Sequence, residues 1–308
     1  SVTYRSTSDD PTVANTRNSR TVTWLVTDAN SDSVGAQISA GVTSTINIAA
    51  VNDATVMVAG ANRAYTEGVS ATAISSGLTL SDVDDTAIAS GATVSITAGL
   101  TSGDVLSIAS GSLLGGATAS YNSGTGVLTF TGSTTVSNYQ SMLRAVSFSS
   151  TSEDPTSQST TRTVTYSVTD ANASAASNSA QTTTATSTVT ITAVNDTPVG
   201  TAGGSLAYTE NGAATAIDTT ITLIDVDDTQ IVGATVTITS ALTGDVLGFT
   251  GQNDITGIYD ASTGVLTLTG TATLAQYETA LRSVTYRSTS DDPTVANTRN
   301  SRTVTWVV

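Results

Sequence analysis

The chain has 308 residues and a formal net charge of −15, with 25 acidic residues against ten basic ones, all arginine. It contains no cysteine and no histidine, which excludes disulfides, thiol nucleophiles, Ser-His catalytic pairs and zinc sites of the usual ligand types. The acidic balance argues against nucleic-acid binding, and no run approaches the ~18 apolar residues of a membrane span.

The sequence repeats itself. Residues 1–24 return unchanged as residues 283–306, and the segment LTLSDVDDT at 78–86 matches ITLIDVDDT at 221–229. Such repeats predict an array of similar domains. Residues 1–50 are then the C-terminal part of one repeat, 51–193 a complete repeat, and 194–308 a third repeat that lacks its last strands. We therefore expect a window on a longer polymer or polypeptide. In the alternative, the strands of 1–50 complete the third repeat of a neighbouring chain, as in donor-strand complementation.

Within a repeat, the predicted elements in chain order are short strands. Apolar residues alternate with polar ones in residues 93–99, 163–170 and 187–194, which is typical of strands with one buried face. Clusters of Gly, Asn, Asp and Ser break these runs every ten or so residues, as in a β-sandwich. Residues 135–146 differ, because Tyr139 and Leu143 are four apart behind a polar start, which predicts one or two helical turns. The predicted fold class is all-β.

Five short motifs follow one another in a fixed order. They are Tyr65-Thr66-Glu67-Gly68, Asp82-Val83-Asp84-Asp85, the hairpin NSGTGVLTF from Asn122, Thr169-Asp170, and Val194-Asn195-Asp196. In this order they resemble the cadherin repeat, in the form of the bacterial cadherin-like modules of giant surface adhesins. The resemblance implies tandem Ig-like Greek-key β-sandwiches outside the cell, with Ca²⁺ at the domain junctions. Ala50, Ala193, Ala54 and Thr197 depart from the linker pattern, which implies one or two ions per junction.

The resemblance also implies a set of calcium ligands. At the junction at 51–53 these are Asn52 and Asp53 from the linker and Asp82, Asp84 and Asp170 from the following domain. At the junction at 194–196 they are Glu67 from the preceding domain, Asn195 and Asp196 from the linker, and Asp225 and Asp227 from the following domain. Asp28 would serve a junction upstream, and Glu210 one downstream.

The residue types suit this chemistry, since Ca²⁺ takes 6–8 oxygen ligands in irregular geometry. In the alternative, the Asp and Asn residues are ordinary turn formers. The acid-acid-Pro triplets, such as Glu153-Asp154-Pro155, predict a turn with an ion pair to a nearby arginine such as Arg162. Trp24 and Trp306 align with Tyr166 on an alternating strand, which predicts core positions.

Three classes of function remain at this point. The first is a structural module of a long extracellular fibre or adhesin, stiffened by calcium, whose partners are neighbouring repeats. The second is an adhesive recognition domain that binds carbohydrate, a partner cell or identical chains. The third, a paired-carboxylate enzyme, fits worst, because the acids recur in every repeat. Aromatic residues make up only 5% of the chain, which disfavours a sugar-stacking platform. The structural, non-enzymatic interpretation is preferred, at the cell surface and without membrane contact in this segment.

Overall fold

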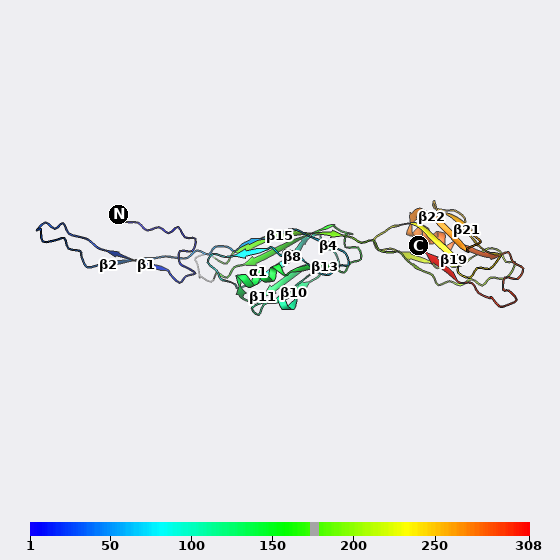
Figure 1. Cartoon of the computed structure of the whole chain (residues 1–308), viewed down its shortest axis with the longest axis horizontal. Helices are drawn as coiled ribbons and strands as arrows, with labels where there is room; N and C mark the ends of the chain where they lie inside the picture. Colours follow the sequence, from blue (N-terminus) through cyan, green and yellow to red (C-terminus); the bar gives the residue numbers. More distant parts are fainter. Residues whose placement is uncertain (173–178) are drawn as a thin grey trace. The chain divides into compact units, whose positions relative to one another are not determined.

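The computed structural model describes residues 1–172 and 179–308. The chain divides into two compact units, Ser1–Val194 and Asn195–Val308. The predicted all-β class is confirmed, because the longer elements are strands and the helices are short (Figure 1). The helices are α1 (Val136–Arg144), α2 (Leu274–Arg282) and the 3₁₀ turn η1 (Ser110–Ser112). The three-part division at 50 and 193 stays a prediction.

Residues 1–50 form a hairpin of two strands within the first unit. Strands β1 (Ser19–Trp24) and β2 (Val42–Asn47) pair antiparallel, with Trp24 opposite Val42 and Ser19 opposite Asn47. The buried residues of this segment are Thr12 and Ala50, so the hairpin has no core of its own. Trp24, predicted to be a core residue, is 39% exposed, and that prediction is wrong for this position.

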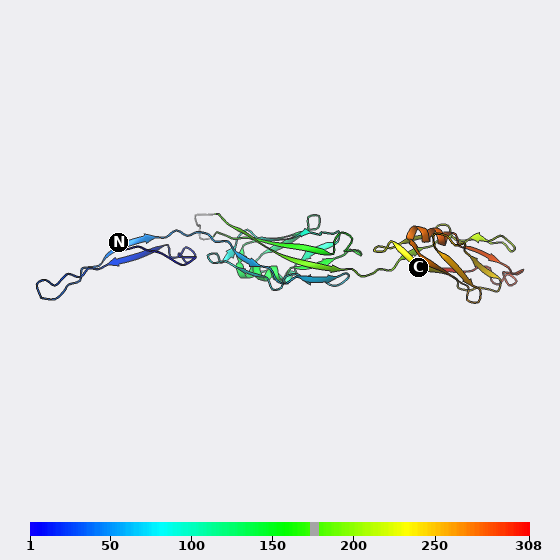
Figure 2. The ribbon, with the colours of Figure 1, turned by 90° about the horizontal axis from the view of Figure 1, so that it is seen from above.

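The complete repeat is built around a six-stranded sheet. Its strand order is β10-β11-β8-β14-β15-β4, and all neighbours are antiparallel except β15 and β4, which run parallel. The sheet is visible in Figures 1 and 2. Its strands are β4 (Arg63–Thr66), β8 (Ala92–Ala98), β10 (Thr118–Asn122), β11 (Val127–Thr131), β14 (Thr161–Thr169) and β15 (Thr182–Thr192).

A smaller sheet and two short ladders complete this repeat. The smaller sheet has the order β5-β13-β9, and the ladders are β3-β6 and β7-β12. Helix α1 begins after Thr135, whose side chain accepts a hydrogen bond from the Asn138 N–H, and it buries Tyr139, Met142 and Leu143, so the predicted helical turns are confirmed. The strands are β3 (Val56–Val58), β5 (Thr72–Ala73), β6 (Thr79–Ser81), β7 (Ala87–Ile88), β9 (Asp104–Ser107), β12 (Thr134–Thr135) and β13 (Ser147–Ser150).

The core of the complete repeat lies between its sheets and α1. The alternating residues Val164, Tyr166 and Val168 of β14 are at most 1% exposed, as their period of two predicts. They pack in one cluster with apolar side chains from the opposite sheet, among them Leu106 and Phe148. This continuous core fixes the loops at either end of the repeat.

The second unit has counterparts of most elements of the complete repeat up to β14. Its sheets have the orders β21-β22-β19-β24, β17-β23-β20 and β16-β18, and α2 buries Tyr277, Ala280 and Leu281. Among its residues, all of which the structure describes, there is no counterpart of β15 or of β4. Its strands are β16 (Val199–Thr201), β17 (Thr215–Ala216), β18 (Thr222–Ile224), β19 (Gln230–Ile238), β20 (Asp245–Gly248), β21 (Thr256–Asp260), β22 (Val265–Thr273), β23 (Thr285–Ser288) and β24 (Val304–Val307).

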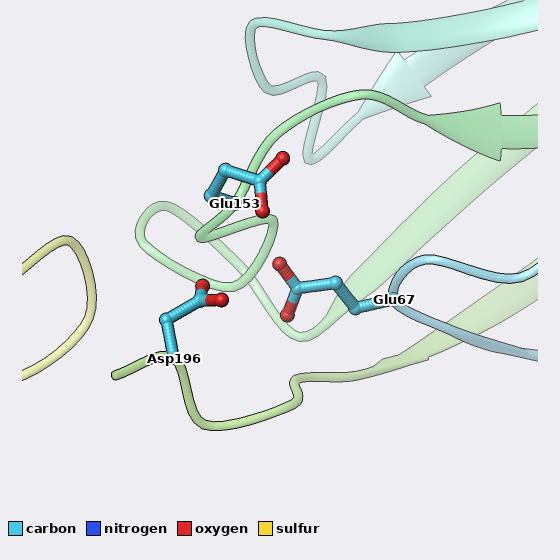
Figure 3. Close-up of side chains that lie close together, drawn as sticks. All are labelled: Glu67, Glu153 and Asp196. Atoms are coloured by element: carbon cyan, nitrogen blue, oxygen red, sulfur yellow. The ribbon is translucent and has the colours of Figure 1, made fainter.

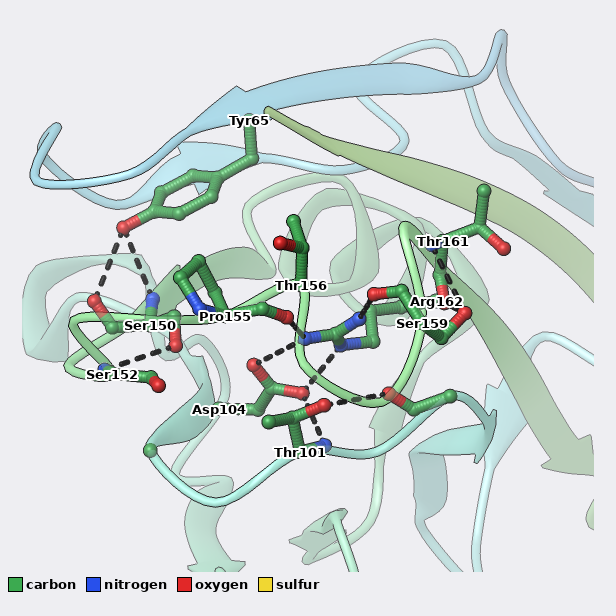
Figure 4. A network of polar contacts seen from close by, with 12 residues as sticks. Tyr65, Thr101, Asp104, Ser150, Ser152, Pro155, Thr156, Ser159, Thr161 and Arg162 are labelled. Atoms are coloured by element: carbon green, nitrogen blue, oxygen red, sulfur yellow. Dashed lines mark hydrogen bonds and ion pairs between the residues drawn. The ribbon is translucent and has the colours of Figure 1, made fainter. Parts of the chain in front are cut away.

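A buried arginine joins the two sheets of the complete repeat (Figure 4). The Arg162 Nε donates to Asp104 Oδ2 at 2.5 Å, and both side chains are fully buried. The same guanidinium donates to the carbonyl oxygens of Pro155 at 2.6 Å and Ser159 at 2.7 Å. The ion pair predicted between Arg162 and the acids before Pro155 is therefore wrong. The Asp154 carboxylate instead accepts from the N–H of Thr156 at 3.2 Å.

Gly91, at the start of β8, carries one of the tightest backbone contacts of the fold. Its φ is +90°, and a Cβ there would lie 2.2 Å from the Phe130 carbonyl oxygen. We expect Gly91→Ala to lower the free energy of unfolding by about 2–4 kcal/mol, because a left-handed backbone and a clash with backbone are combined. Gly116→Ala is the matched control, since Gly116 has φ +78° but nothing within 4 Å. Thermal unfolding should show a clearly larger loss for Gly91→Ala; equal losses would contradict this account.

Candidate metal site

Three loops meet at the start of the complete repeat: the linker at 51–53, the turn at 82–85 after β6, and the turn at 170–172 after β14. The Asn52 Nδ2 donates to Asp170 Oδ2 at 3.0 Å, which ties the linker to the end of β14. The Asp53 N–H donates to Asp84 Oδ2 at 3.2 Å, which ties it to the turn after β6. We call Asn52, Asp53, Asp82, Asp84, Asp85 and Asp170 the acidic cluster.

The turn at 82–85 shows how the sequence shapes this cluster. The Asp82 Oδ1 accepts hydrogen bonds from the backbone N–H of Asp84 at 3.1 Å and of Asp85 at 2.8 Å, the local pattern for which Asp is favoured in turns. Asp84 and Asp85 are only 5% and 4% exposed. The turn therefore directs two carboxylates away from solvent.

Asp170 lies at the end of β14 and is fully buried. Both of its carboxylate oxygens accept from the Gln181 N–H at 3.0 Å. Asp28 holds the same place after β1, where its Oδ1 accepts from the N–H of Asn30 and of Gln37, each at 3.1 Å. Asp28 is exposed, because residues 1–50 carry no further loop of their repeat against it.

Two carboxylate oxygens of the cluster lack hydrogen-bond partners. Asp82 Oδ2 and Asp84 Oδ1 are buried, and neither has a partner among the described residues. Burying such an oxygen without a partner costs about 1–3 kcal/mol or more. A hard cation would offset this cost, and the donors here are all carboxylate and amide oxygens, which Ca²⁺ prefers. The donor types of the acidic cluster therefore suit a calcium ion.

Asp82 differs in its acid-base behaviour from an ordinary carboxylate. Burial raises the pKa of Asp82 to about 6; the neighbouring Asp84 carboxylate acts in the same direction, and the hydrogen bonds from the backbone N–H groups of Asp85 and Asp84 oppose it. Close carboxylates repel one another by ~4 kcal/mol at 4 Å in a surface-like dielectric. Asp82 therefore holds its proton up to a higher pH than an ordinary aspartate does.

The second unit carries the same turn after β18. Asp225, Asp227 and Asp228 each offer a carboxylate oxygen within 4.8 Å of those of the other two. Among the described residues, the carboxylates of Asp82, Asp84 and Asp170 do not all lie this close to one another. The Asp227 Oδ2 accepts from the Asp196 N–H at 3.1 Å, as Asp84 does from Asp53. For Asp225 the cost of burial is outweighed by hydrogen bonds from the N–H groups of Asp228 and Asp227, and its pKa is lowered.

The other end of the complete repeat presents two glutamates. The Glu67 Oε2 accepts from the Val194 N–H at 2.8 Å, where β4 and β15 both end. A carboxylate oxygen of Glu153 lies within 4.8 Å of one of Glu67, and the two side chains point toward each other (Figure 3). Glu210, the counterpart of Glu67 in the second unit, is exposed.

The structure thus brings some of the predicted residues together and leaves others apart. Asn52, Asp53, Asp82, Asp84 and Asp170 form one cluster, and Asp196, Asp225 and Asp227 lie together in the second unit. Asn195 is exposed and donates from Nδ2 to the Asp196 carbonyl oxygen at 2.8 Å. The sequence analysis did not name Asp85, Asp228 and Glu153 as candidate ligands. The sequence does indicate Asp85 and Asp228 as possible ligands, because each is the third acid of a DVDD motif. Glu153 was instead assigned to a turn.

No family model matches the chain. Among curated proteins, Halomucin of Haloquadratum walsbyi is 40% identical over an alignment of 91 residues, and the match covers 27% of this chain and 1% of Halomucin. The chain therefore spans a very small part of that protein. Of the described residues, none belongs to a helix with the length and apolarity of a membrane span.

Several solved structures resemble the chain, all at low identity. Protocadherin Gamma B2 extracellular cadherin domains 1–5 are 12% identical with a TM-score of 0.30, and the match covers 84% of this chain and 39% of that one. The human Desmocollin-1 ectodomain is 14% identical with a TM-score of 0.29, covering 81% and 39%. The Protocadherin gammaB7 EC3-6 cis-dimer is 15% identical with a TM-score of 0.31, covering 84% and 52%. Scores of this size support no inference about function.

Proposed function

We propose that the chain is a segment of tandem β-sandwich repeats in a long extracellular fibre or adhesin, whose junctions between repeats are stiffened by Ca²⁺. The observation that carries this proposal is a pair of buried oxygens, Asp82 Oδ2 and Asp84 Oδ1, at the end of the repeat where the linker enters; neither has a hydrogen-bond partner among the described residues. Buried carboxylates without a cationic partner are costly, and a divalent cation would remove that cost.

The recurrence of the site in both units supports a structural rather than a catalytic role. The same turn, with the same hydrogen bond from the linker N–H, is present at Asp84 and at Asp227. A feature needed at every junction recurs in every repeat, whereas an array has no need to repeat one active site. The match to 1% of Halomucin supports the same proposal, since 91 residues make up so small a share only of a chain several thousand residues long.

The proposed ligands at each junction come from three parts of the chain. At 194–196 we propose Glu67 and Glu153 from the preceding repeat, the linker residue Asp196, and Asp225 and Asp227 from the following repeat. At the junction at 51–53 we propose the residues of the acidic cluster as ligands, together with further ligands from the preceding repeat. Asp28, the counterpart of Asp170, would be a ligand at a junction upstream, and Glu210, the counterpart of Glu67, would be a ligand at a junction downstream.

Calcium titration calorimetry of the whole chain tests the proposal. Binding in the range of about 10⁻⁴–10⁻³ M is expected, as for other extracellular modules. The double variant Asp82→Asn/Asp84→Asn should lose the binding that belongs to the acidic cluster. Asp260→Asn is the matched control, because Asp260 is an exposed acid in the β21–β22 turn that accepts from Ser262.

The pH dependence gives a second arm of the same titration. Because burial raises the pKa of Asp82 to about 6, at about pH 5 an ion must displace a proton that is absent at about pH 7.5. Binding should therefore weaken on acidification in the unmodified chain, and less so in the double variant. Identical heats in the chain, the double variant and the control would show that these aspartates are turn residues and nothing more.

A further inference from the structure

A tight turn in the second unit contains a chemically reactive pair of residues. Asn211 is the only asparagine in the sequence that precedes a glycine, Gly212. The Gly212 N–H donates to the Thr209 carbonyl oxygen at 2.9 Å, which closes the turn. Asn211 has φ +59°, in the left-handed region that asparagine enters more readily than other residues with a side chain. The pair therefore lies in a defined backbone conformation.

The complete repeat has the same turn, so its shape is a property of the repeat. There Gly68 takes the place of Asn211, with φ +72°, and the Val69 N–H donates to the Thr66 carbonyl oxygen at 3.3 Å. Gly68 is exposed, and a Cβ at this position would have nothing within 4 Å. A side chain at this place in the turn is therefore open to solvent in the complete repeat as well.

A tyrosine fixes the backbone of the turn from the side of the core. The Tyr208 hydroxyl donates to the Gly212 carbonyl oxygen at 2.8 Å and accepts from the N–H of Ser288, the last residue of β23, at 3.2 Å. Tyr65 makes the same two kinds of contact in the complete repeat. These bonds involve the backbone on either side of Asn211 and leave its side chain out.

The side-chain amide of Asn211 has nothing to hold it. Asn211 is exposed, and among the described residues no hydrogen bond reaches its side chain. Other asparagines differ, since Asn62 Oδ1 accepts from the Thr188 N–H at 3.1 Å and Asn138 Nδ2 donates to Thr134 Oγ1 at 2.7 Å. The Asn211 amide can therefore rotate toward the backbone that follows it.

We propose that Asn211 is a site of spontaneous deamidation in the folded chain, with water as the co-reactant. The backbone nitrogen of Gly212 attacks the Asn211 Cγ, and the new N–Cγ bond closes a five-membered imide ring. The Cγ–Nδ2 bond breaks, and Nδ2 leaves as ammonia together with the proton of the Gly212 N–H. Glycine favours this step because it has no Cβ beside the attacking nitrogen and is conformationally permissive.

The first step requires that the hydrogen bond from Gly212 to Thr209 opens. Backbone hydrogen bonds in exposed loops open at little cost in free energy, unlike those of a buried sheet. Both Thr209 and Gly212 are exposed. The turn therefore slows the reaction without preventing it. This inference goes beyond the proposed function and does not depend on it.

Hydrolysis of the ring gives two products. Water adds to one of the two ring carbonyl carbons, and the bond from that carbon to nitrogen breaks. Opening at Cγ gives aspartate, whereas opening at the backbone carbonyl gives isoaspartate, in which the chain runs through the former side chain. Either product adds one negative charge beside Glu210 to a chain of net charge −15. The isoaspartate form also lengthens the backbone before Gly212, so the contact of Gly212 with Tyr208 should weaken.

Peptide mapping by mass spectrometry tests the proposal on the unmodified, folded chain. The chain is kept at mildly alkaline pH and digested in water enriched in the heavy oxygen isotope, which marks any deamidation during the digestion itself. Asn253 is the internal control, because it is exposed and has φ +53° but precedes Asp254 instead of a glycine. We expect several-fold more conversion at Asn211 than at Asn253.

A variant and an enzymatic readout complete the test. Asn211→Gly restores the residue that the complete repeat has in this turn, so the fold should be kept. A protein isoaspartyl methyltransferase with a labelled methyl donor should label the aged unmodified chain several-fold more than the aged variant. Conversion at Asn211 no faster than at Asn253, conversion found only after unfolding in urea, or equal labelling of the chain and the variant would overturn the proposal.

Discussion

Arg162→Met is expected to lower the free energy of unfolding of the first unit by about 3–5 kcal/mol, the usual effect of breaking a buried ion pair by removing one partner. The substitution leaves the Asp104 carboxylate buried with a charge that only neutral donors then face. It also removes two hydrogen bonds, to the carbonyl oxygens of Pro155 and Ser159. The whole loop between β13 and β14 is therefore expected to loosen.

The second unit provides the matched control. Arg302 donates to Asp245 Oδ2 at 2.6 Å and to the Pro293 carbonyl at 2.7 Å, so its contacts are the same in kind. Its side chain is partly exposed, at 10% against 0% for Arg162. Because solvent screens an exposed charge, Arg302→Met should cost less.

Scanning calorimetry with each variant measures both effects on the whole chain. The expected result is a large downward shift of one unfolding transition for Arg162→Met and a smaller shift for Arg302→Met. The double variant Asp104→Leu/Arg162→Met should recover part of the loss, because no uncompensated charge then remains buried. A negligible shift for Arg162→Met would contradict the assigned role of this arginine.

Patterns of near neighbours in the sequence predicted the local structure well. The period of two in 163–170 predicts a half-buried strand, and Val164, Tyr166 and Val168 are indeed buried. The spacing of Tyr139 and Leu143 predicts helical turns, and α1 buries both. These features depend on residues a few positions apart, which is why one sequence suffices to find them.

Features that depend on distant residues were not predictable in the same way. Arg162 is paired with Asp104, 58 residues away, because β9 and the start of β14 meet across the sandwich. The nearer acids Glu153 and Asp154 were the natural choice from spacing alone. Trp24 has the same sequence environment as a core residue, yet it is exposed because residues 1–50 bury no apolar core.

The candidate site falls between these cases. The order of the motifs predicted that the linker at 51–53, the turn at 82–85 and the turn at 170–172 lie at one end of a repeat. The hydrogen bonds from Asn52 to Asp170 and from Asp53 to Asp84 show that these three loops do meet there. The burial of Asp85 and the nearness of Glu153 to Glu67 depend on how loops close over the core. The presence of calcium and its role at the junctions stay a prediction.

The prediction with the largest effect on the molecule as a whole is that calcium limits the motion between its two units. Domain interfaces within a chain are mobile unless something strong fixes them. The linker ValAsnAspThr at 194–197 is too short and too poor in glycine and serine to act as a long flexible tether. Ligands from both repeats on one cation would hold the junction, and chelation would release it while each sandwich stays folded on its own core.

Small-angle X-ray scattering of the chain, at a concentration where it is monomeric, is the most direct test. With millimolar calcium we expect a narrow distribution of distances, which should broaden on chelation and recover when calcium returns. Asp225→Asn/Asp227→Asn should resemble the chelated protein in both conditions, whereas Asp260→Asn should behave as the unmodified chain. Circular dichroism should show the same strand content throughout. A scattering profile that calcium leaves unchanged, in the unmodified chain as in the double variant, would contradict the proposal that calcium stiffens the array.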